Sequence, residues 1–247
     1  PVIKDFSFDA KPGQRIAIVG HTGAGKTTII NLLMRFYEPS SGEILIDGVP
    51  IQEMKRSEVR RLFGMVLQDT WLFEGTIKEN IVFDRRITDS KLKSILDKSK
   101  ILHMIEGLPN GLDFEINEET NNMSAGEKQL LTIARGMIED APFLILDEAT
   151  SNVDTRTEEL VQKAMDKLTE GRTSFIIAHR LSTIKNADCI MYVDKGNILE
   201  KGNHDELIVI ELILGELVHV VLHEGRSAQQ VVQRNVEEAL DLRSVQV

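Results

Sequence analysis

The sequence predicts an α/β fold, in which a mainly parallel β-sheet is covered by helices and carries an inserted helical lobe. Three observations support this prediction. Short apolar runs that fit buried strands alternate with helical patterns, a glycine-rich turn joins the first such run to a helix, and helical patterns dominate residues 70–140. Strands that alternate with helices pair in parallel, because each helix returns the chain to the same end of the sheet.

The first elements expected along the chain surround the glycine-rich turn. Arg15–Val19 is a short apolar run that ends in a glycine, and Ile29–Met34 has a helical pattern. Glu43–Gly48 alternates between polar and apolar residues and ends in Asp-Gly, which predicts a strand followed by a turn. Further helices are expected at 89–106, 124–138 and 155–168, and further strands at 142–146, 173–178 and 189–193.

These elements divide the chain into three parts. Residues 1–68 and 141–207 are expected to form the core, and residues 69–140 are expected to form the inserted helical subdomain. Residues 208–247 form a divergent C-terminal tail, to which the sequence assigns no chemistry.

The composition argues against some classes of function. The 247 residues carry a formal net charge of −10, which argues against a nucleic-acid partner because a duplex requires a basic binding face. No run of about eighteen uncharged apolar residues occurs, so we expect no membrane span. The single cysteine, Cys189, cannot form an intrachain disulfide and is interpreted as a small buried residue.

The glycine-rich turn matches the phosphate-binding pattern G-x-x-x-x-G-K-S/T between an expected strand and an expected helix. Its glycines let backbone N–H groups turn inward around phosphate oxygens, and the start of the helix adds the positive end of its dipole. We expect Lys26 to reach the β- and γ-phosphates of ATP and Thr27 to hold Mg²⁺. The core is therefore predicted to be that of a P-loop NTPase, with the nucleotide bound by Gly20, His21, Thr22, Gly23, Ala24, Gly25, Lys26, Thr27 and Thr28.

Two acids follow the apolar run at 142–146. Ligands of open parallel sheets gather at the carboxyl ends of the strands, which is where Asp147 and Glu148 are expected to lie. We expect Asp147 to orient Mg²⁺ through its water shell. Glu148 is the candidate general base for the water that attacks the γ-phosphate.

With these residues placed, the sequence resembles the nucleotide-binding domains of ATP-binding-cassette (ABC) transporters. Met123–Glu127, which reads M-S-A-G-E, is similar to the family's signature L-S-G-G-Q. Gln68 matches the family's Q-loop, Ser151–Asp154 its D-loop, and His179 its switch histidine. These motifs follow one another in the family's order.

Further stretches are similar to the multidrug and peptide exporters of this family. They are Leu72–Ile81, which follows the Q-loop, and His179–Ile184. Glu118 aligns with the exporter X-loop acid, which the family uses to contact membrane domains. The flanking family glycines are replaced here by Asn117 and Thr120.

The resemblance implies a role for each motif residue. Lys26, Glu148 and His179 are the expected catalytic residues: Glu148 aligns the water, and His179 contacts the γ-phosphate. The expected Mg²⁺ ligands are Thr27, Gln68 and Asp147. Outside the phosphate loop, the expected nucleotide contacts are Gln68, Ser124, Ala125, Gly126 and Glu127.

The resemblance also implies partners. A head-to-tail pair of such domains uses both anion sites of each chain, because the signature of one closes over the phosphate loop of the other. Hydrolysis of ATP by this dimer would drive the transmembrane domains of an exporter. The chain is then expected at the cytoplasmic face of the cell membrane, held there by those domains.

Two departures from the signature bear on whether the dimer is a homodimer or a heterodimer. Ala125 replaces a glycine and Glu127 replaces glutamine, and both changes are expected to weaken that half-site modestly. They fit a heterodimer in which this chain supplies the weaker signature, and they fit tolerated variation in a homodimer equally well. Two other functions are a soluble ABC ATPase that is not coupled to transport and a nucleotide-dependent switch with little turnover. Glu148 argues against the switch.

Overall fold

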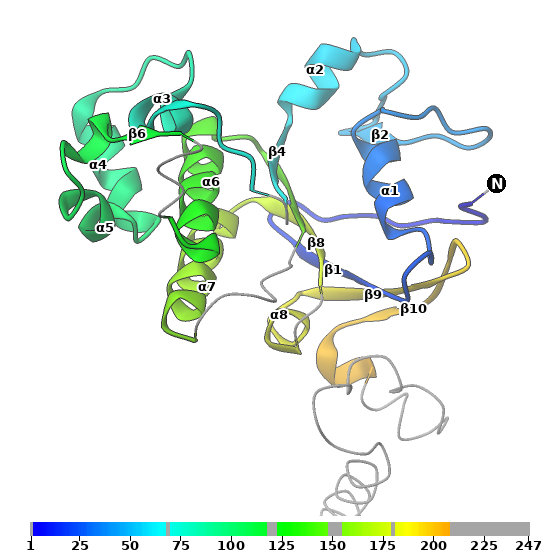
Figure 1. Cartoon of the computed structure of the whole chain (residues 1–247). Coiled ribbons are helices and arrows are strands. Elements are labelled where there is room, and N and C mark those ends of the chain that lie inside the picture. Colours follow the sequence, from blue (N-terminus) through cyan, green and yellow to red (C-terminus); the bar gives the residue numbers. More distant parts are fainter. Residues whose placement is uncertain (1, 68–69, 118–122, 148–154, 179–180, 208–247) are drawn as a thin grey trace, which may run out of the picture.

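The computed structural model describes residues 2–67, 70–117, 123–147, 155–178 and 181–207. A six-stranded sheet runs through the centre of this part of the chain (Figure 1). Its strands lie in the order β10 (Asn197–Gly202), β9 (Cys189–Asp194), β1 (Arg15–Val19), β8 (Thr173–Ile177), β7 (Phe143–Asp147) and β4 (Phe63–Val66). All neighbours pair in parallel except β10 and β9, which are antiparallel. The α/β fold with a mainly parallel sheet is therefore confirmed.

Helices cover both faces of the sheet. Alternate residues of β1 point to opposite faces, so Ile16 and Ile18 pack in the cluster that contains Ile29 of α1 (Lys26–Leu33). Ala17 points the other way and packs with Ile184 of α8 (Leu181–Lys185). α2 (Arg56–Arg61) lies with α1, and its Val59 is buried in the same cluster as Ile29.

A larger apolar cluster joins the sheet to the remaining helices. Leu144 and Leu146 of β7 pack with Leu131 of α6 (Ala125–Glu139) and Leu168 of α7 (Thr155–Thr169). The same cluster includes residues of α3 (Ile77–Val82), α4 (Asp89–Lys98) and α5 (Leu102–Glu106). These helices form the lobe beside the sheet in Figure 1. The boundaries of the inserted subdomain at 69 and 140 stay a prediction, because the apolar cluster runs without a break from this lobe onto β7 and α7.

Local signals set the ends of the lobe helices. The Thr76 hydroxyl accepts a hydrogen bond from Glu79 N at 3.1 Å at the start of α3, and the Thr88 hydroxyl accepts one from Lys91 N at the start of α4. The helix expected over 89–106 is interrupted, because Lys100 has a φ of 63° between α4 and α5. Short elements complete the lobe: η1 (Gly111–Asp113) and the paired strands β5 (Gly75–Thr76) and β6 (Glu115–Ile116).

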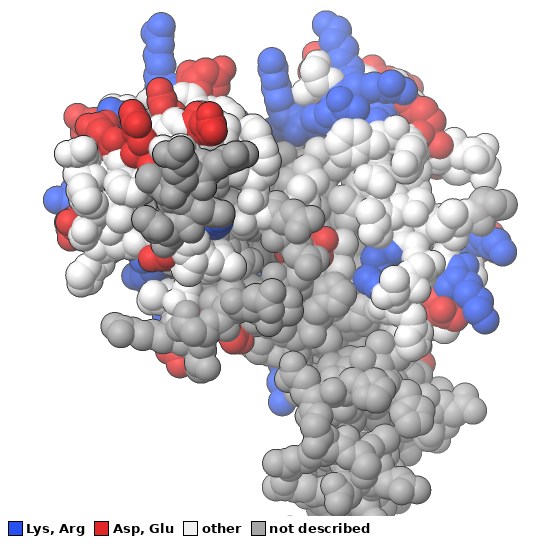
Figure 2. All heavy atoms as spheres, viewed as in Figure 1, with Lys and Arg blue, Asp and Glu red and all other residues white. Residues whose placement is uncertain are grey.

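The region around α2 carries clustered basic side chains (Figure 2). Part of this charge is used within the chain: Arg56 pairs with Glu38 at 3.1 Å, and the guanidinium of Arg60 lies 4.6 Å from the ring centre of Phe36. The hairpin of β2 (Leu45–Ile46) and β3 (Val49–Pro50) precedes α2 along the chain.

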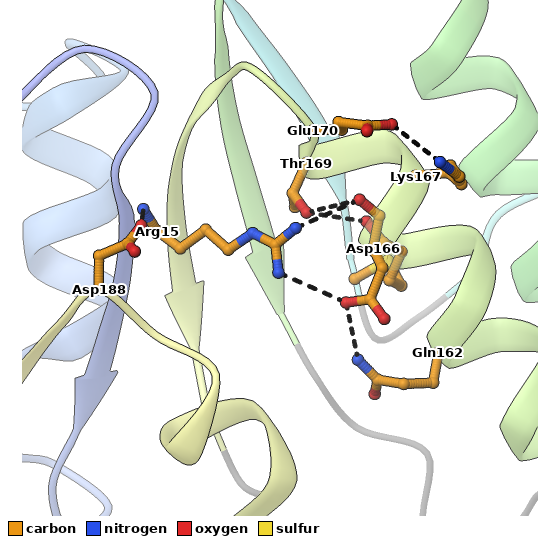
Figure 3. Close-up of polar contacts among 8 residues, drawn as sticks. Arg15, Gln162, Asp166, Lys167, Thr169, Glu170 and Asp188 are labelled. Atoms are coloured by element: carbon orange, nitrogen blue, oxygen red, sulfur yellow. Dashed lines mark hydrogen bonds and ion pairs between the residues drawn. The ribbon is translucent and has the colours of Figure 1, made fainter. Parts of the chain in front are cut away.

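The amino end of β1 is tied to α7 (Figure 3). Arg15 donates its backbone N–H to the Asp188 carboxylate at 2.8 Å, and its guanidinium extends to Asp166 on α7, with Nη1 and Oδ1 at 3.6 Å. Gln162 lies 3.5 Å from the same carboxylate oxygen. These contacts tie the carboxyl-terminal part of α7 to the end of β1 opposite the glycine-rich loop.

None of the helices in the described part of the chain combines the length and the apolarity that crossing a bilayer requires.

Candidate functional site

The phosphate loop lies between the carboxyl end of β1 and the start of α1. Gly20, the first residue after β1, has a φ of 152° and packs so closely on the chain that a Cβ would overlap the carbonyl oxygen of Val193 in β9. Only glycine fits there without moving the backbone. The strand, loop and helix expected from the sequence are all present.

The start of α1 is open to an anion. Gly25 is the N-cap residue and supplies no side-chain capping bond, and no acidic residue lies in the first turn. The Ile29 N–H donates back to the Gly25 carbonyl at 3.0 Å, so the N–H groups of Lys26, Thr27 and Thr28 precede this first helical bond. These donors and the positive end of the helix dipole suit a phosphate group.

Lys26 points back across the loop. Its ammonium donates hydrogen bonds to the carbonyl oxygens of Gly20 at 2.6 Å and His21 at 3.0 Å. Burial lowers the pKa of Lys26 below its ordinary value, and the negative charge of Asp147 opposes this shift. Within the loop, two residues are buried, Ala24 and Gly25. Four others are exposed: His21, Thr22, Gly23 and Thr27. A charged lysine beside exposed backbone donors suits a polyphosphate.

Asp147 reaches the same edge of the sheet as the phosphate loop. Ile177 of β8 pairs with Ile18 of β1 on one side and with Asp147 of β7 on the other. Asp147 therefore lies level with the end of β1, two strand spacings or about 10 Å away across the sheet. The hydroxyl of Thr27 and the carboxylate of Asp147 supply the oxygen ligands that Mg²⁺ prefers, so these residues fit the expected metal.

Three of the expected site residues, Gln68, Glu148 and His179, lie outside the described residues, as do Glu118 and the D-loop at 151–154. Each follows an element whose end is described. Val66 of β4 pairs with Leu146 of β7, so the segment that leads to Gln68 starts from the same edge.

The signature segment begins helix α6. Ser124 is the N-cap residue: its Oγ accepts a hydrogen bond from Glu127 N at 3.2 Å, and its own N–H donates to Glu127 Oε2 at 2.7 Å. This reciprocal pair is a capping box, which either glutamate or glutamine completes. Glu127 therefore stabilises the start of α6 in this chain. Ser124 and Ala125 are exposed, and Gly126 is buried.

The support behind the phosphate loop comes from a turn that belongs to none of the sequence motifs. Gly196, in the turn between β9 and β10, donates its N–H to the Ala24 carbonyl at 2.9 Å, and its carbonyl accepts from Lys4 N at 2.9 Å. The Lys195-Gly196 pair, with φ values of 45° and 80°, is a sequence signal for the turn between β9 and β10. It does not indicate that this turn binds the phosphate loop.

A protein-family model described as ABC transporter matches residues 3–151. This chain belongs to the ABC transporter family. Membership of the family implies ATP binding, and the phosphate loop, the edge carboxylate and the capped signature helix are all placed consistently with it.

Relatives of this ABC transporter chain are longer proteins. It is 54% identical over 211 residues to a fatty acid ABC transporter ATP-binding/permease protein of Mycobacterium bovis, covering 84% of the chain and 33% of the relative. It is 48% identical to a probable multidrug resistance ABC transporter ATP-binding/permease protein of Bacillus subtilis, covering 85% of the chain and 31% of the relative. An ATP-dependent lipid A-core flippase of Methylobacillus flagellatus is 45% identical, with 85% and 36% covered.

A solved structure has the same fold. A bacterial Atm1-family ABC exporter with ATP bound superposes with a TM-score of 0.77 at 40% sequence identity, covering 85% of this chain and 37% of the exporter chain. The ABC transporter chain therefore spans about one third of the length of the relatives it matches.

Proposed function

We propose that the chain is the ATP-binding and ATP-hydrolysing cassette of an ABC exporter. The observation that carries this proposal is the phosphate loop, whose lysine and open helix start lie at the same sheet edge as Asp147. The exporter assignment rests on the relatives, which are named as ATP-binding/permease proteins, as a flippase and as an exporter. These relatives argue against a soluble ABC ATPase.

The chemistry follows from the residue types. The loop N–H groups and Lys26 bind the β- and γ-phosphates and neutralise the charge that develops during transfer. Glu148 accepts the proton of the attacking water, and His179 contacts the γ-phosphate. Thr27, Gln68 and Asp147 would hold Mg²⁺, which would supply further neutralisation of phosphate charge.

A second cassette completes the site. Ser124 uses its Oγ lone pair to accept the Glu127 N–H, so its hydroxyl proton remains for donation to the γ-phosphate held by the partner. Ala125 and Glu127 leave the homodimer and the heterodimer equally open. Cooperative ATPase activity from this chain alone identifies the homodimer, whereas a requirement for a second, different subunit identifies the heterodimer.

The helical lobe offers a surface for the transmembrane domains. Trp71 and Phe83 are exposed by 66% and 49%, and the ring of Phe73 lies between them at centroid distances of 5.9 and 5.3 Å. Exposed aromatic clusters of this kind favour protein–protein contacts. We place the cytoplasmic loops of the membrane domains here, which holds the cassette at the cytoplasmic face of the membrane.

Two variants test the proposal in the full transporter. Lys26→Met is expected to abolish ATP retention in the presence of Mg²⁺, because the phosphates lose their only loop cation. Glu148→Gln is expected to retain ATP and to hydrolyse it at least tenfold more slowly, which corresponds to about 1.4 kcal/mol of barrier or more. Equilibrium binding of labelled ATP and release of phosphate measure the two steps separately. Unchanged turnover in Glu148→Gln would remove the assignment of the base.

A further inference from the structure

Arg135 connects the signature helix to a distant segment of the lobe. It lies about three turns after Ser124 on α6, and its guanidinium leaves the helix toward α3, which lies beside α6 (Figure 1). Nε donates to the Asn80 carbonyl at 2.9 Å, and Nη1 donates to the Trp71 carbonyl at 3.3 Å. The guanidinium carbon also lies 4.8 Å from the ring centre of Phe83. One side chain thus holds backbone groups before α3 and within it.

Asn80 extends this connection. Its side chain is 1% exposed, and its amide group brackets the segment before α3: Oδ1 accepts from Phe73 N at 3.0 Å, and Nδ2 donates to the carbonyl oxygens of Phe73 at 2.9 Å and Thr76 at 3.1 Å. Arg135 Nη2 lies 3.5 Å from the same Oδ1. The segment 71–76, helix α3 and helix α6 are therefore joined by one polar network around two side chains.

The position of this network gives it a functional consequence. Segment 71–76 follows Gln68 directly along the chain, and α6 begins at the signature. A displacement at one end of the network is transmitted to the other, because these hydrogen bonds, most of which are partly buried, are costly to break together. Only arginine suits the task, because its planar fork reaches several acceptors at fixed angles, whereas lysine presents a single ammonium.

We propose that Arg135, with Asn80, is a positioning residue that couples the segment following Gln68 to the signature helix. Nucleotide binding at Gln68 and placement of Ser124 over the partner's ATP then occur together. The inference rests on the proposed function, since it concerns the same ATP site.

The single tryptophan of the 247-residue chain provides the measurement. Trp71 lies in the segment, and its carbonyl accepts a bond from Arg135, so its emission reports the position of the segment. In Arg135→Lys we expect the affinity for Mg-ATP to stay within twofold of the wild type. We expect the ATP-induced change in Trp71 emission to fall by at least half. In the full transporter, kcat for ATP hydrolysis falls at least fivefold while KM is unchanged.

Arg85→Lys is the matched control. Arg85 also binds α6, because it donates to the backbone carbonyl of Glu139 at 2.9 Å and to the side-chain carboxylate of Glu139 at 3.0 Å. Among the described residues it has no hydrogen bond to segment 71–76. This control is expected to keep the Trp71 response and kcat. If Arg135→Lys is too unstable to study, Arg135→Gln retains a donor for Asn80 and lacks the reach to Trp71, and the same losses are expected.

Several outcomes overturn the inference. An undiminished Trp71 response in Arg135→Lys and Arg135→Gln would show that the segment is positioned without the arginine. Equal losses in Arg85→Lys would reduce the network to general support of the fold. Wild-type chain that binds ATP without any change in Trp71 emission also contradicts the coupling. Wild-type chain that fails to bind ATP instead refutes the proposed function, and this inference with it.

Discussion

Replacing Gly20 with alanine tests whether the phosphate loop owes its shape to contact with β9. Gly20 has a φ of 152°, and a Cβ there would overlap the carbonyl oxygen of Val193 while lying 3.2 Å from its carbonyl carbon. The obstacle is backbone in a buried strand, so it does not move aside as the end of a flexible side chain does. The methyl group therefore forces the loop and the strand apart.

The expected cost has two parts. Forcing a methyl group into packed structure costs about 1–3 kcal/mol, and a positive φ in a non-glycine residue costs roughly 1–2 kcal/mol. The sum is about 3.5 kcal/mol, and about 2–4 °C of Tm per kcal/mol gives a fall of about 7–14 °C for a chain of this size. Gly23→Ala is the control: φ is 84°, but a Cβ meets nothing within 4 Å among the described residues. Only the backbone part remains, so Tm falls by about 3–6 °C.

Thermal unfolding of the two variants, followed by circular dichroism without nucleotide, separates the two parts. Omitting ATP matters, because a bound ligand adds its own stabilisation to the folded state. Equal Tm losses in Gly20→Ala and Gly23→Ala would refute the argument, because the close approach to Val193 would then contribute nothing.

Further variants probe the site and the core. Lys26 has a lower pKa in the folded chain than its ordinary 10.5, so the unfolded chain binds more protons between the two values and stability rises with pH through that window. Lys26→Met should lose this rise, and parallel thermal unfolding of both proteins at pH 7 and pH 10 measures it; an equal rise in the variant would contradict the prediction. Glu127→Gln should keep the capping box and should lower KM for ATP, because it removes a negative charge. Glu127→Ala should lose the capping box and about 1 kcal/mol of stability. Thermal unfolding and steady-state hydrolysis distinguish the two variants, and a fall in stability with glutamine contradicts the capping role. The buried Ser174 hydroxyl has no hydrogen-bond partner among the described residues. Ser174→Ala should therefore raise the free energy of unfolding by about 1 kcal/mol, or Tm by about 2–4 °C. A loss of stability on thermal unfolding would contradict this prediction.

Sequence patterns located most elements because their signals are local. The strand at Arg15–Val19 was predicted with its observed bounds, and the helix expected from 124 matches α6 with Ser124 as its cap. The strands expected at 142–146, 173–178 and 189–193 each lie within one residue of an observed strand. Apolar runs of this length are explained by burial on both faces of a parallel sheet.

The missed strands lack that signal. β4 contains Gly64, a residue that strands disfavour. Gly64 pairs with Leu144 of β7, and a Cβ at position 64 would lie 3.1 Å from Leu144 Cδ2, which is closer than ordinary van der Waals contact. β10 is an edge strand whose residues are half-buried or exposed, so its composition is that of a loop. The antiparallel edge of the sheet therefore depends on the Lys195-Gly196 turn and on pairing with β9, because β10 itself has no apolar pattern.

For the site, spacing predicted the phosphate loop, Asp147 and the capped signature, because each motif is contiguous in the chain. The support from Gly196 and the network around Arg135 join residues far apart in sequence, so no motif contains them. The roles of all these site residues in binding and hydrolysing ATP stay predictions, and Gln68, Glu148 and His179 also lie outside the described residues.

The strand order has a consequence for how the cassette is made. β1 and β7 carry the phosphate loop and Asp147, yet they are not neighbours, because β8 lies between them and pairs with both. While the chain grows on the ribosome, the lysine and the aspartate remain on strands without a shared partner until Thr173–Ile177 has been added. The nucleotide pocket is therefore a late product of synthesis. An incomplete chain that ends before this strand contains the whole phosphate loop and Asp147 but lacks the strand that holds them side by side.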